Sequence, residues 1–429
     1  MNTSAQTISI THPGEFKHKL LSWANRFGIF CFLDHNGYPT DSPTFDYLLA
    51  AGTKRQLELT PQNPFQQLKD FFDERPCWLF GHLGYDLKNS LEDVNTSRPA
   101  FIDFGIGHFF EPEILIRVTG NQALIEGHNL NPNIIDEILH ENPEQKQATG
   151  ILSLQPLFSK QEYLTKIEKI KAHIQRGDCY ELNFCQQFIA KNAYINPIQT
   201  FINLNAVSPN PYASFYKLNN RYCLTASPER FLKKTGQTLI SQPIKGTAKR
   251  DPNNSFLDHQ YKTNLLNSQK ERSENVMIVD LVRNDLSRIC KSGTVTVQEL
   301  FGIYTFPQVF QMISSIRGEL PPTAHWTDAL KVCFPMGSMT GAPKKRVMEL
   351  IDQYEEMGRG LFSGSIGYIT PQADFDFNVV IRSIFYDQAN HYLSYAAGGG
   401  ITFYSIAQNE YEECLLKAAA IQQVFNNNL

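Results

Sequence analysis

The stretch FNVVIRSIFYDQANHYLSYAAGGGIT, residues 377–402, contains two runs that are rich in β-branched and aromatic residues. FNVVIRSIFY (377–386) and HYLSYAA (391–397) therefore predict strands, as does RYCLTA (221–226) earlier in the chain. Helices are predicted over 162–176, where Leu164, Ile167, Ile170 and Ile174 have helical spacing before Gly177, and over 408–425. Together these segments favour an α+β fold with substantial antiparallel sheet.

Two features inside this stretch suggest a ligand. Arg382 is predicted in the middle of a strand with apolar neighbours, and a buried arginine needs an anionic partner, either internal or a substrate carboxylate. Gly398, Gly399 and Gly400 follow the second strand, where they allow either close backbone approach to a ligand or a simple turn.

Composition limits the class of protein. The 429 residues are 42% hydrophobic and 19% charged, so the chain can bury a large core. A net charge of −4 without a basic block argues against nucleic acid as a partner. No apolar run approaches the ~18 residues of a membrane span, and the N-terminus lacks the features of a secretory signal. Eight scattered cysteines without a CxxC pair suggest reduced thiols in the cytoplasm and no zinc site.

The composition of the chain changes near residue 150. Residues 129–150 are polar and rich in helix breakers, which predicts a linker or an exposed loop. We therefore expect an N-terminal region over 1–150 and a second region over 151–429.

Four glutamates form two pairs with i,i+3 spacing: Glu271 with Glu274, and Glu410 with Glu413. On a helix such residues share a face, where like charges repel. Two facing pairs would be stable around a cation, and oxygen ligands favour Mg²⁺ or Ca²⁺. The alternative is a solvated helix face.

The segment GSMTGAPKKRVMELID (337–352) predicts a loop that enters a helix, with Thr340 or Gly341 as the cap and Pro343 in the first turn. Such a start can bind an anion, or it can be an ordinary helix start. The chain lacks the P-loop pattern GxxxxGK[ST].

Lys245 lies in SQPIKGTAKR (241–250), at a predicted strand-to-turn corner, where a surface role does not explain it. Glu229 lies in SPERF (227–231), after another predicted strand. If both strands share a sheet, the two residues can act as a nucleophile and an acid/base; otherwise Glu229 is an ordinary loop glutamate.

Six motifs in order resemble the chorismate-utilising enzymes: PIKGT (243–247), ENVMIVDLVRND (274–285), GSMTGAPKKR (337–346), GSIGYI (364–369), VVIRS (379–383) and AGGGI (397–401). GHLGYDL (81–87) is similar to the family's N-terminal signature. The resemblance implies the fold of anthranilate synthase component I, with large antiparallel β-sheets that face each other and helices on the outside.

Within this family, a lysine in PIKGT is typical of the branch that aminates chorismate at C4, the aminodeoxychorismate synthases. The resemblance implies that Lys245 adds to C2 while the C4 hydroxyl leaves, and that ammonia then adds at C4 and expels the lysine. An unperturbed lysine has a pKa of about 10.4, so we expect burial or a nearby cation to lower the pKa of Lys245. The alternatives are an anthranilate synthase component I, which is a lyase, and a non-catalytic chorismate-binding paralogue.

The resemblance also assigns roles to the other site residues. It implies that Glu229 protonates the departing hydroxyl, and that Mg²⁺ binds Glu274 and Glu413 with support from Glu271 and Glu410. It places the enolpyruvyl carboxylate of the substrate at Arg382 and the backbone of Gly398, Gly399 and Gly400. Further expected substrate contacts are Gly246, Thr247, Ser338 and Lys417.

Two positions depart from other branches of the family. Gln311 stands where many relatives have a histidine that serves pyruvate elimination, which weakens the lyase alternative. Glu181 lies near the position of the water-activating lysine of isochorismate-type enzymes, which argues against ring hydroxylation. No glutaminase signature is visible, so we expect ammonia to come from solution or from a separate glutamine amidotransferase subunit, in a cytoplasmic pathway to p-aminobenzoate and folate.

Overall fold

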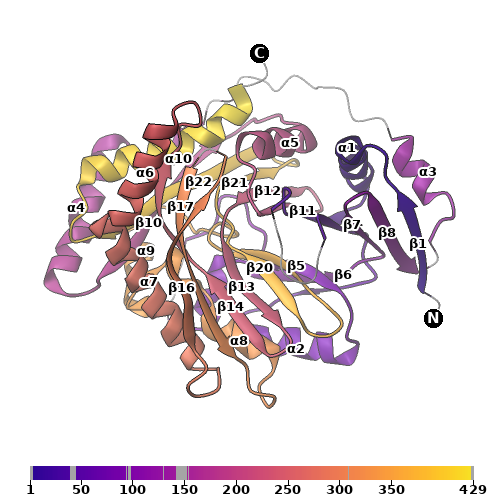
Figure 1. Cartoon of the computed structure of the whole chain (residues 1–429), viewed down its shortest axis with the longest axis horizontal. Coiled ribbons are helices and arrows are strands. Elements are labelled where there is room, and N and C mark those ends of the chain that lie inside the picture. Colours follow the sequence, from indigo (N-terminus) through magenta and orange to yellow (C-terminus); the bar gives the residue numbers. More distant parts are fainter. Residues whose placement is uncertain are drawn as a thin grey trace.

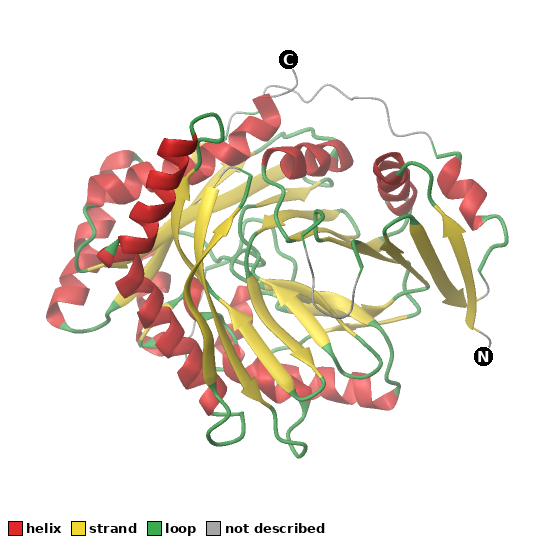
Figure 2. Cartoon of the chain, viewed as in Figure 1, coloured by secondary structure: helices red, strands yellow, loops and turns green. Residues whose placement is uncertain are grey.

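The computed structural model describes residues 3–38, 45–92, 94, 98–128, 130–141, 152, 154–307 and 309–426. Two large antiparallel sheets face each other, and most helices lie on the outside, as Figures 1 and 2 show. The expected α+β fold with facing antiparallel sheets is confirmed.

The larger sheet is antiparallel throughout. Its strand order is β1 (Thr3–Ser9), β8 (Gln122–His128), β7 (Ile114–Thr119), β3 (Tyr47–Ala51), β2 (Ile29–Asp34), β11 (Tyr212–Leu218), β12 (Arg221–Ser227), β21 (Ser383–Asp387), β22 (Tyr392–Thr402), β10 (Glu181–Ala190) and β18 (Gly341–Ala342), with β9 (Gln155–Pro156) also paired to β10.

The smaller sheet is also antiparallel. Its order is β15 (Ile244–Lys249), β17 (Val309–Glu319), β14 (Thr238–Gln242), β13 (Arg230–Thr235), β20 (Phe375–Asn378), β19 (Ser365–Ile369), β5 (Leu79–Leu83), β6 (Gly107–Glu111) and β4 (Arg55–Glu58), with β16 (Thr296–Thr305) also paired to β17. Strands from before and after residue 150 occur in both sheets, so that boundary does not separate one sheet from the other.

Alternation along the strands builds two cores. Phe30 and Phe32 of β2 pack into the core on the outer face of the larger sheet, whereas Cys31 and Leu33 pack into the core between the sheets. The outer core includes residues of α1 (Pro13–Ala24), α3 (Ile134–Leu139), α4 (Lys160–Arg176), α5 (Pro197–Val207), α9 (Lys344–Tyr354) and α10 (Ala407–Asn426). The second core includes residues of α2 (Pro64–Glu74), α7 (Gln269–Ser287) and α8 (Trp326–Cys333). Beside β15 lies α6 (Ser255–Asn267), and two 3₁₀ helices, η1 (Tyr85–Ser90) and η2 (Gly337–Met339), complete the elements.

Several predicted elements are confirmed. α4 covers the predicted helix 162–176, and Gly177 ends it in the left-handed conformation with φ +90°. β12, β22 and α10 match the other predicted segments.

The prediction of one strand over 377–386 is wrong. β20 ends at Asn378 in the smaller sheet, and β21 begins at Ser383 in the larger sheet, so the chain crosses between the sheets over 379–382. Arg382 is therefore in the crossing and not mid-strand, and its φ of +51° lies in the left-handed region. The run looks like a strand because its apolar residues are buried in either conformation.

Three smaller corrections follow. The glycines at 398–400 lie within β22 and not after it. Pro343 is the cap of α9, and Gly341 pairs with β10 as part of β18. The segment 129–150 contains the short helix α3, while residues 129 and 142–150 of that predicted linker lie outside the described residues.

Within the described ranges, no helix has the length and apolar character that a membrane span requires.

The buried side chain of Arg359 connects η2 with β10. Its guanidinium pairs with Glu355, and the two side chains are 1% and 6% exposed. It also donates to the backbone oxygens of Met339 in η2, at 2.6 Å, and Asn183 in β10, at 2.8 Å. Glu355 in turn accepts from the backbone N–H of Cys185 at 3.0 Å. This network fixes the GSMTGAPKKR loop against β10.

We expect Arg359→Met to lower the free energy of unfolding by about 3–5 kcal/mol, because it leaves Glu355 buried without its partner. Arg346→Met is the matched control, since Arg346 is 40% exposed and its pairs with Glu349 and Asp178 should each contribute no more than about 1 kcal/mol. Urea denaturation of both variants measures the difference. Equal losses in the two variants would contradict a structural role for the network.

Candidate active site

Lys245 forms the centre of the site. It lies on β15, where the pairing with β17 shifts register between Ile244 and Thr247 and Gly246 has φ +95°. This local irregularity is typical of a β-bulge, which redirects the strand. The Lys245 side chain is buried and its Nζ donates to Glu181 Oε1 on β10. The pair therefore links the smaller sheet to the larger one.

Gly399 and Gly400 of β22 leave the space in which this pair and the neighbouring carboxylates lie. A Cβ at Gly400 would stand 2.5 Å from Glu181 Oε1 and 2.9 Å from Lys245 Nζ. A Cβ at Gly399 would lie 3.5 Å from both Glu410 and Glu413. At Gly398 it would lie 2.0 Å from the backbone oxygen of Phe184, so side chains are excluded there by the sheet itself.

The two predicted glutamate pairs come from α7 and α10. Lys270 lies between them, with its Nζ 3.9 Å from Glu274 and 3.5 Å from Glu410. Glu413 pairs with Lys417 at 2.8 Å. The Oε1 of Glu274 is buried and has no hydrogen-bond partner among the described residues. The pairs thus face each other across a cationic side chain, and they are not two unrelated solvated faces.

Glu229 lies in the turn between β12 and β13, and its charge acts on Lys245. Burial raises its pKa to about 7, although the Ser338 hydroxyl and the charge of Lys245 oppose the shift. Near neutral pH a substantial fraction of this carboxyl is therefore protonated, as a general acid requires.

Arg382 contributes a cation from the crossing between the sheets. Burial lowers the pKa of its guanidinium to about 10, and the charge of Glu229 opposes this shift. No described carboxylate lies within ion-pair distance of the guanidinium. A partly buried arginine without an internal anion is suited to a ligand carboxylate.

The expected lowering of the Lys245 pKa is wrong for this arrangement. Burial does lower it, but the negative charges of Glu181 and Glu274 outweigh burial and raise the pKa of Lys245 above its ordinary value. The pKa of Glu274 is raised to about 8, chiefly by burial, against the charge of Lys245. The lysine is thus an ammonium held by carboxylates.

The structure also gives the positions of Thr247, Gln311 and Ser338. Thr247 is exposed on β15 and pairs in register with Gln311 of β17. Gln311 is buried, and its amide oxygen has no hydrogen-bond partner in the described part of the chain. Ser338 is buried in η2 and its backbone oxygen accepts from Asn183 of β10.

Two residues of this cluster, Glu181 and Lys270, were not predicted from the sequence to be part of the site. Glu181 was noted only as a position without lysine, although a charged residue that begins an otherwise apolar strand is an available signal. Lys270 directly precedes Glu271, and nothing in its spacing indicates that it reaches across to α10.

The glutamates suit a metal by their chemistry, since they offer only oxygen ligands and one of those oxygens is buried without a partner. As placed, however, no three histidine, cysteine, aspartate or glutamate side chains in the described ranges converge closely enough to hold an ion.

Comparison with known proteins supports the expected family. The chorismate binding enzyme family matches residues 36–423. Aminodeoxychorismate synthase component 1 of Salmonella typhimurium is 35% identical over 375 residues, which are 87% of this chain and 81% of that protein. The corresponding protein of Klebsiella aerogenes is 40% identical over 356 residues, covering 80% of this chain and 75% of that protein.

A solved structure shares the fold. Anthranilate synthase component I from Streptococcus pneumoniae TIGR4 superimposes with a TM-score of 0.78 at 25% identity, covering 90% of this chain and 93% of that one. The match over nearly the whole length agrees with the six ordered motifs and with the convergence of their residues around Lys245. The chain therefore belongs to the chorismate binding enzyme family.

Proposed function

We propose that the protein is an aminodeoxychorismate synthase component I, which converts chorismate and ammonia to 4-amino-4-deoxychorismate. The observation that carries this proposal is the PIKGT lysine, buried among carboxylates at the junction of the two sheets. Relatives with identities of 32–40% bear the name of this enzyme component, which agrees with that chemistry. The pathway to p-aminobenzoate and folate and a cytoplasmic location are part of the same proposal.

In the proposed reaction, Lys245 Nζ forms a bond to C2 of the chorismate ring. The ring π electrons shift, the C4–O bond breaks, and the oxygen leaves as water with the proton of Glu229. Ammonia then adds at C4, the electrons shift back, and the bond to Lys245 breaks. The raised pKa of Glu229 supports its role, because the carboxyl must hold a proton at the start.

The two carboxylates of chorismate need cationic or N–H partners. Arg382 and the backbone along Gly398, Gly399 and Gly400 would bind the enolpyruvyl carboxylate. Ser338, Gly246, Thr247 and Lys417 would complete the substrate contacts, as expected from the sequence. Arg382 is suited to this role because it has no internal ion pair in the described structure.

Mg²⁺ would be held by Glu274 and Glu413, with Glu271 and Glu410 in support. When bound, the ion would neutralise the carboxylates and attract the ring carboxylate of the substrate. Lys270 now provides positive charge between the same side chains, so ion binding would require it to move aside.

The proposed ammonia source is a separate glutamine amidotransferase subunit. The word component in the names of the relatives is compatible with a partner. The cysteines of this chain are poor nucleophiles, because burial raises the pKa of Cys179 to about 11 and the pKa of Cys185 and Cys223 to about 12.

Purified protein with chorismate, Mg²⁺ and ammonium should form 4-amino-4-deoxychorismate, identified by mass and ultraviolet spectrum. Glutamine in place of ammonium should give no product until a glutaminase subunit is added. Formation of anthranilate and pyruvate instead would identify the lyase alternative, and no turnover would identify a binding paralogue.

Lys245→Ala should abolish amination at C4, because it removes the nucleophile, and should weaken chorismate binding, because it removes a positive charge from a site for a dianion. Lys249→Ala, an exposed lysine on the same strand, is the matched control and should retain activity. The product assay and titration of chorismate measure the two effects. Aminodeoxychorismate production by Lys245→Ala at the normal rate would disprove the covalent role.

Glu274→Gln and Glu413→Gln should each raise the Mg²⁺ concentration for half-maximal activity by about tenfold or more, since each removes a negative charge from the ion site. Glu412→Gln is the control on the same helix, because Glu412 is exposed and bonds Gln408. Titration of activity against Mg²⁺ gives the comparison. Unchanged half-saturation in both test variants would contradict the proposed metal site.

A further inference from the structure

Glu181 is a deeply buried carboxylate that is ion-paired through only one of its two oxygens. It is 1% exposed at the start of β10, and its Oε1 accepts from Lys245 Nζ. Its Oε2 is also buried, but has no hydrogen-bond partner within the described residues. The Oε1 lies against Gly400, where any larger residue would displace the pair.

A purely structural ion pair would be expected to satisfy both oxygens. Glu355 illustrates such a case, because Arg359 bonds both its oxygens and the backbone of Cys185 adds a third bond. A buried carboxylate oxygen that remains unpaired is costly, and unpaired groups of this kind occur preferentially where they have a function. Glu181 therefore calls for a role beyond holding the sheets together.

We infer that Glu181 is the base that accepts a proton from Lys245 before the lysine attacks, and returns it when the lysine is released. This inference rests on the proposed function. The geometry that supports it is the direct contact of Glu181 Oε1 with Nζ, the atom that would form the bond, together with an oxygen that has a free lone pair.

The proton and electron balance is complete. One proton moves from the Lys245 ammonium to Glu181, which leaves a neutral amine and a neutral acid. The lone pair of the amine forms the bond to C2 and gives a secondary ammonium, while water leaves C4 with the proton of Glu229. When ammonia adds at C4, Lys245 departs as a neutral amine and recovers its proton from Glu181. The new ammonium at C4 gives a proton to Glu229.

Other charged groups face the pair from neighbouring elements. Glu274 of α7 and Glu229 both favour the protonated lysine. Arg382 acts on Glu229 from the crossing between the sheets. None of the described hydrogen bonds or ion pairs joins these groups directly to Nζ, so Glu181 is the base that is in contact.

The test compares Glu181→Gln and Glu181→Asp in the full chain with saturating ammonium. Glutamine keeps the shape and can accept a hydrogen bond, but it cannot take the proton, so kcat should fall by about 10²–10⁴-fold. Chorismate binding should be undiminished, because the variant removes a negative charge from a site for a dianion. Aspartate retains the base and should restore part of the rate.

The second readout is the covalent adduct itself. Intact-protein mass spectrometry without ammonium should detect the Lys245 adduct in the wild type and not in Glu181→Gln. A Glu181→Gln enzyme that forms the adduct at the normal rate would overturn the inference, as would an Asp variant no more active than the Gln variant. Failure of the proposed function is distinguishable, since the wild type would then make no aminodeoxychorismate.

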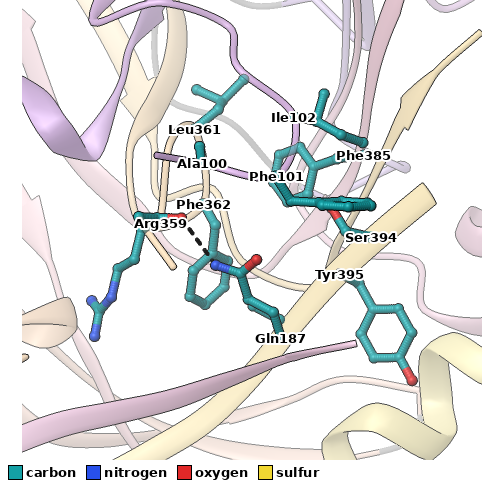
Figure 3. Close-up of a pocket in the computed structure, with 12 residues that line it drawn as sticks. Ala100, Phe101, Ile102, Gln187, Arg359, Leu361, Phe362, Phe385, Ser394 and Tyr395 are labelled. Carbon is teal, nitrogen blue, oxygen red and sulfur yellow. Dashed lines mark hydrogen bonds between the residues drawn. The ribbon is translucent and has the colours of Figure 1, made fainter. Parts of the chain in front are cut away.

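Gln187→Met is the control for disturbance of β10. Gln187 lies further along the same strand and donates to the backbone oxygen of Gly358 at 3.0 Å, as Figure 3 shows. It lines a cavity of about 10 Å³, which admits no more than about one water molecule. This variant should keep wild-type kcat, whereas a loss equal to that of Glu181→Gln would attribute the effect to the strand and overturn the inference.

Discussion

The ammonium of Lys245 is buried, and a buried charge is stable only beside a charge of opposite sign. The smaller sheet supplies the lysine from β15, and the larger sheet supplies Glu181 from β10, so the pair is formed only when the sheets have the correct separation and register. Gly400 is the residue of β22 that leaves room for both side chains. Arg359 and Glu355 join β10 to the η2 loop. Site geometry and core structure therefore depend on the same contacts.

Electrostatics explain why so many carboxylates are tolerated near one lysine. Lys245 and Lys270 each pair with a glutamate of a neighbouring element, and Lys417 pairs with Glu413 of its own helix. Burial is the main cause that raises the pKa of Glu229 to about 7 and of Glu274 to about 8, which limits the negative charge near neutral pH. Arrival of a dianionic substrate would add two charges to this balance. A site of this composition is suited to bind an anion together with a cation.

Much of the fold could be predicted from the sequence because it depends on local patterns, whereas the candidate site residues were named from the resemblance to a known family. Helical spacing followed by Gly177 defined α4, and the ordered motifs identified the residues that gather around Lys245. The break between β20 and β21 could not be predicted, since residues 379–381 are apolar in a crossing as they would be in a strand. The direction in which the pKa of Lys245 shifts also could not be predicted. It depends on Glu181, and the position of Glu181 is set by the packing of the two sheets.

The sharing of both sheets by early and late strands has a consequence for synthesis on the ribosome. The first 128 residues contain β1 to β8, which can pair among themselves as soon as they emerge. Their open edges, however, are β2 and β5, whose partners β11 and β19 lie at residues 212–218 and 365–369. Each edge exposes unpaired backbone groups until its partner is translated. The nascent chain therefore carries an unpaired strand edge for most of its elongation, and such an edge is a site where pairing with another chain can begin.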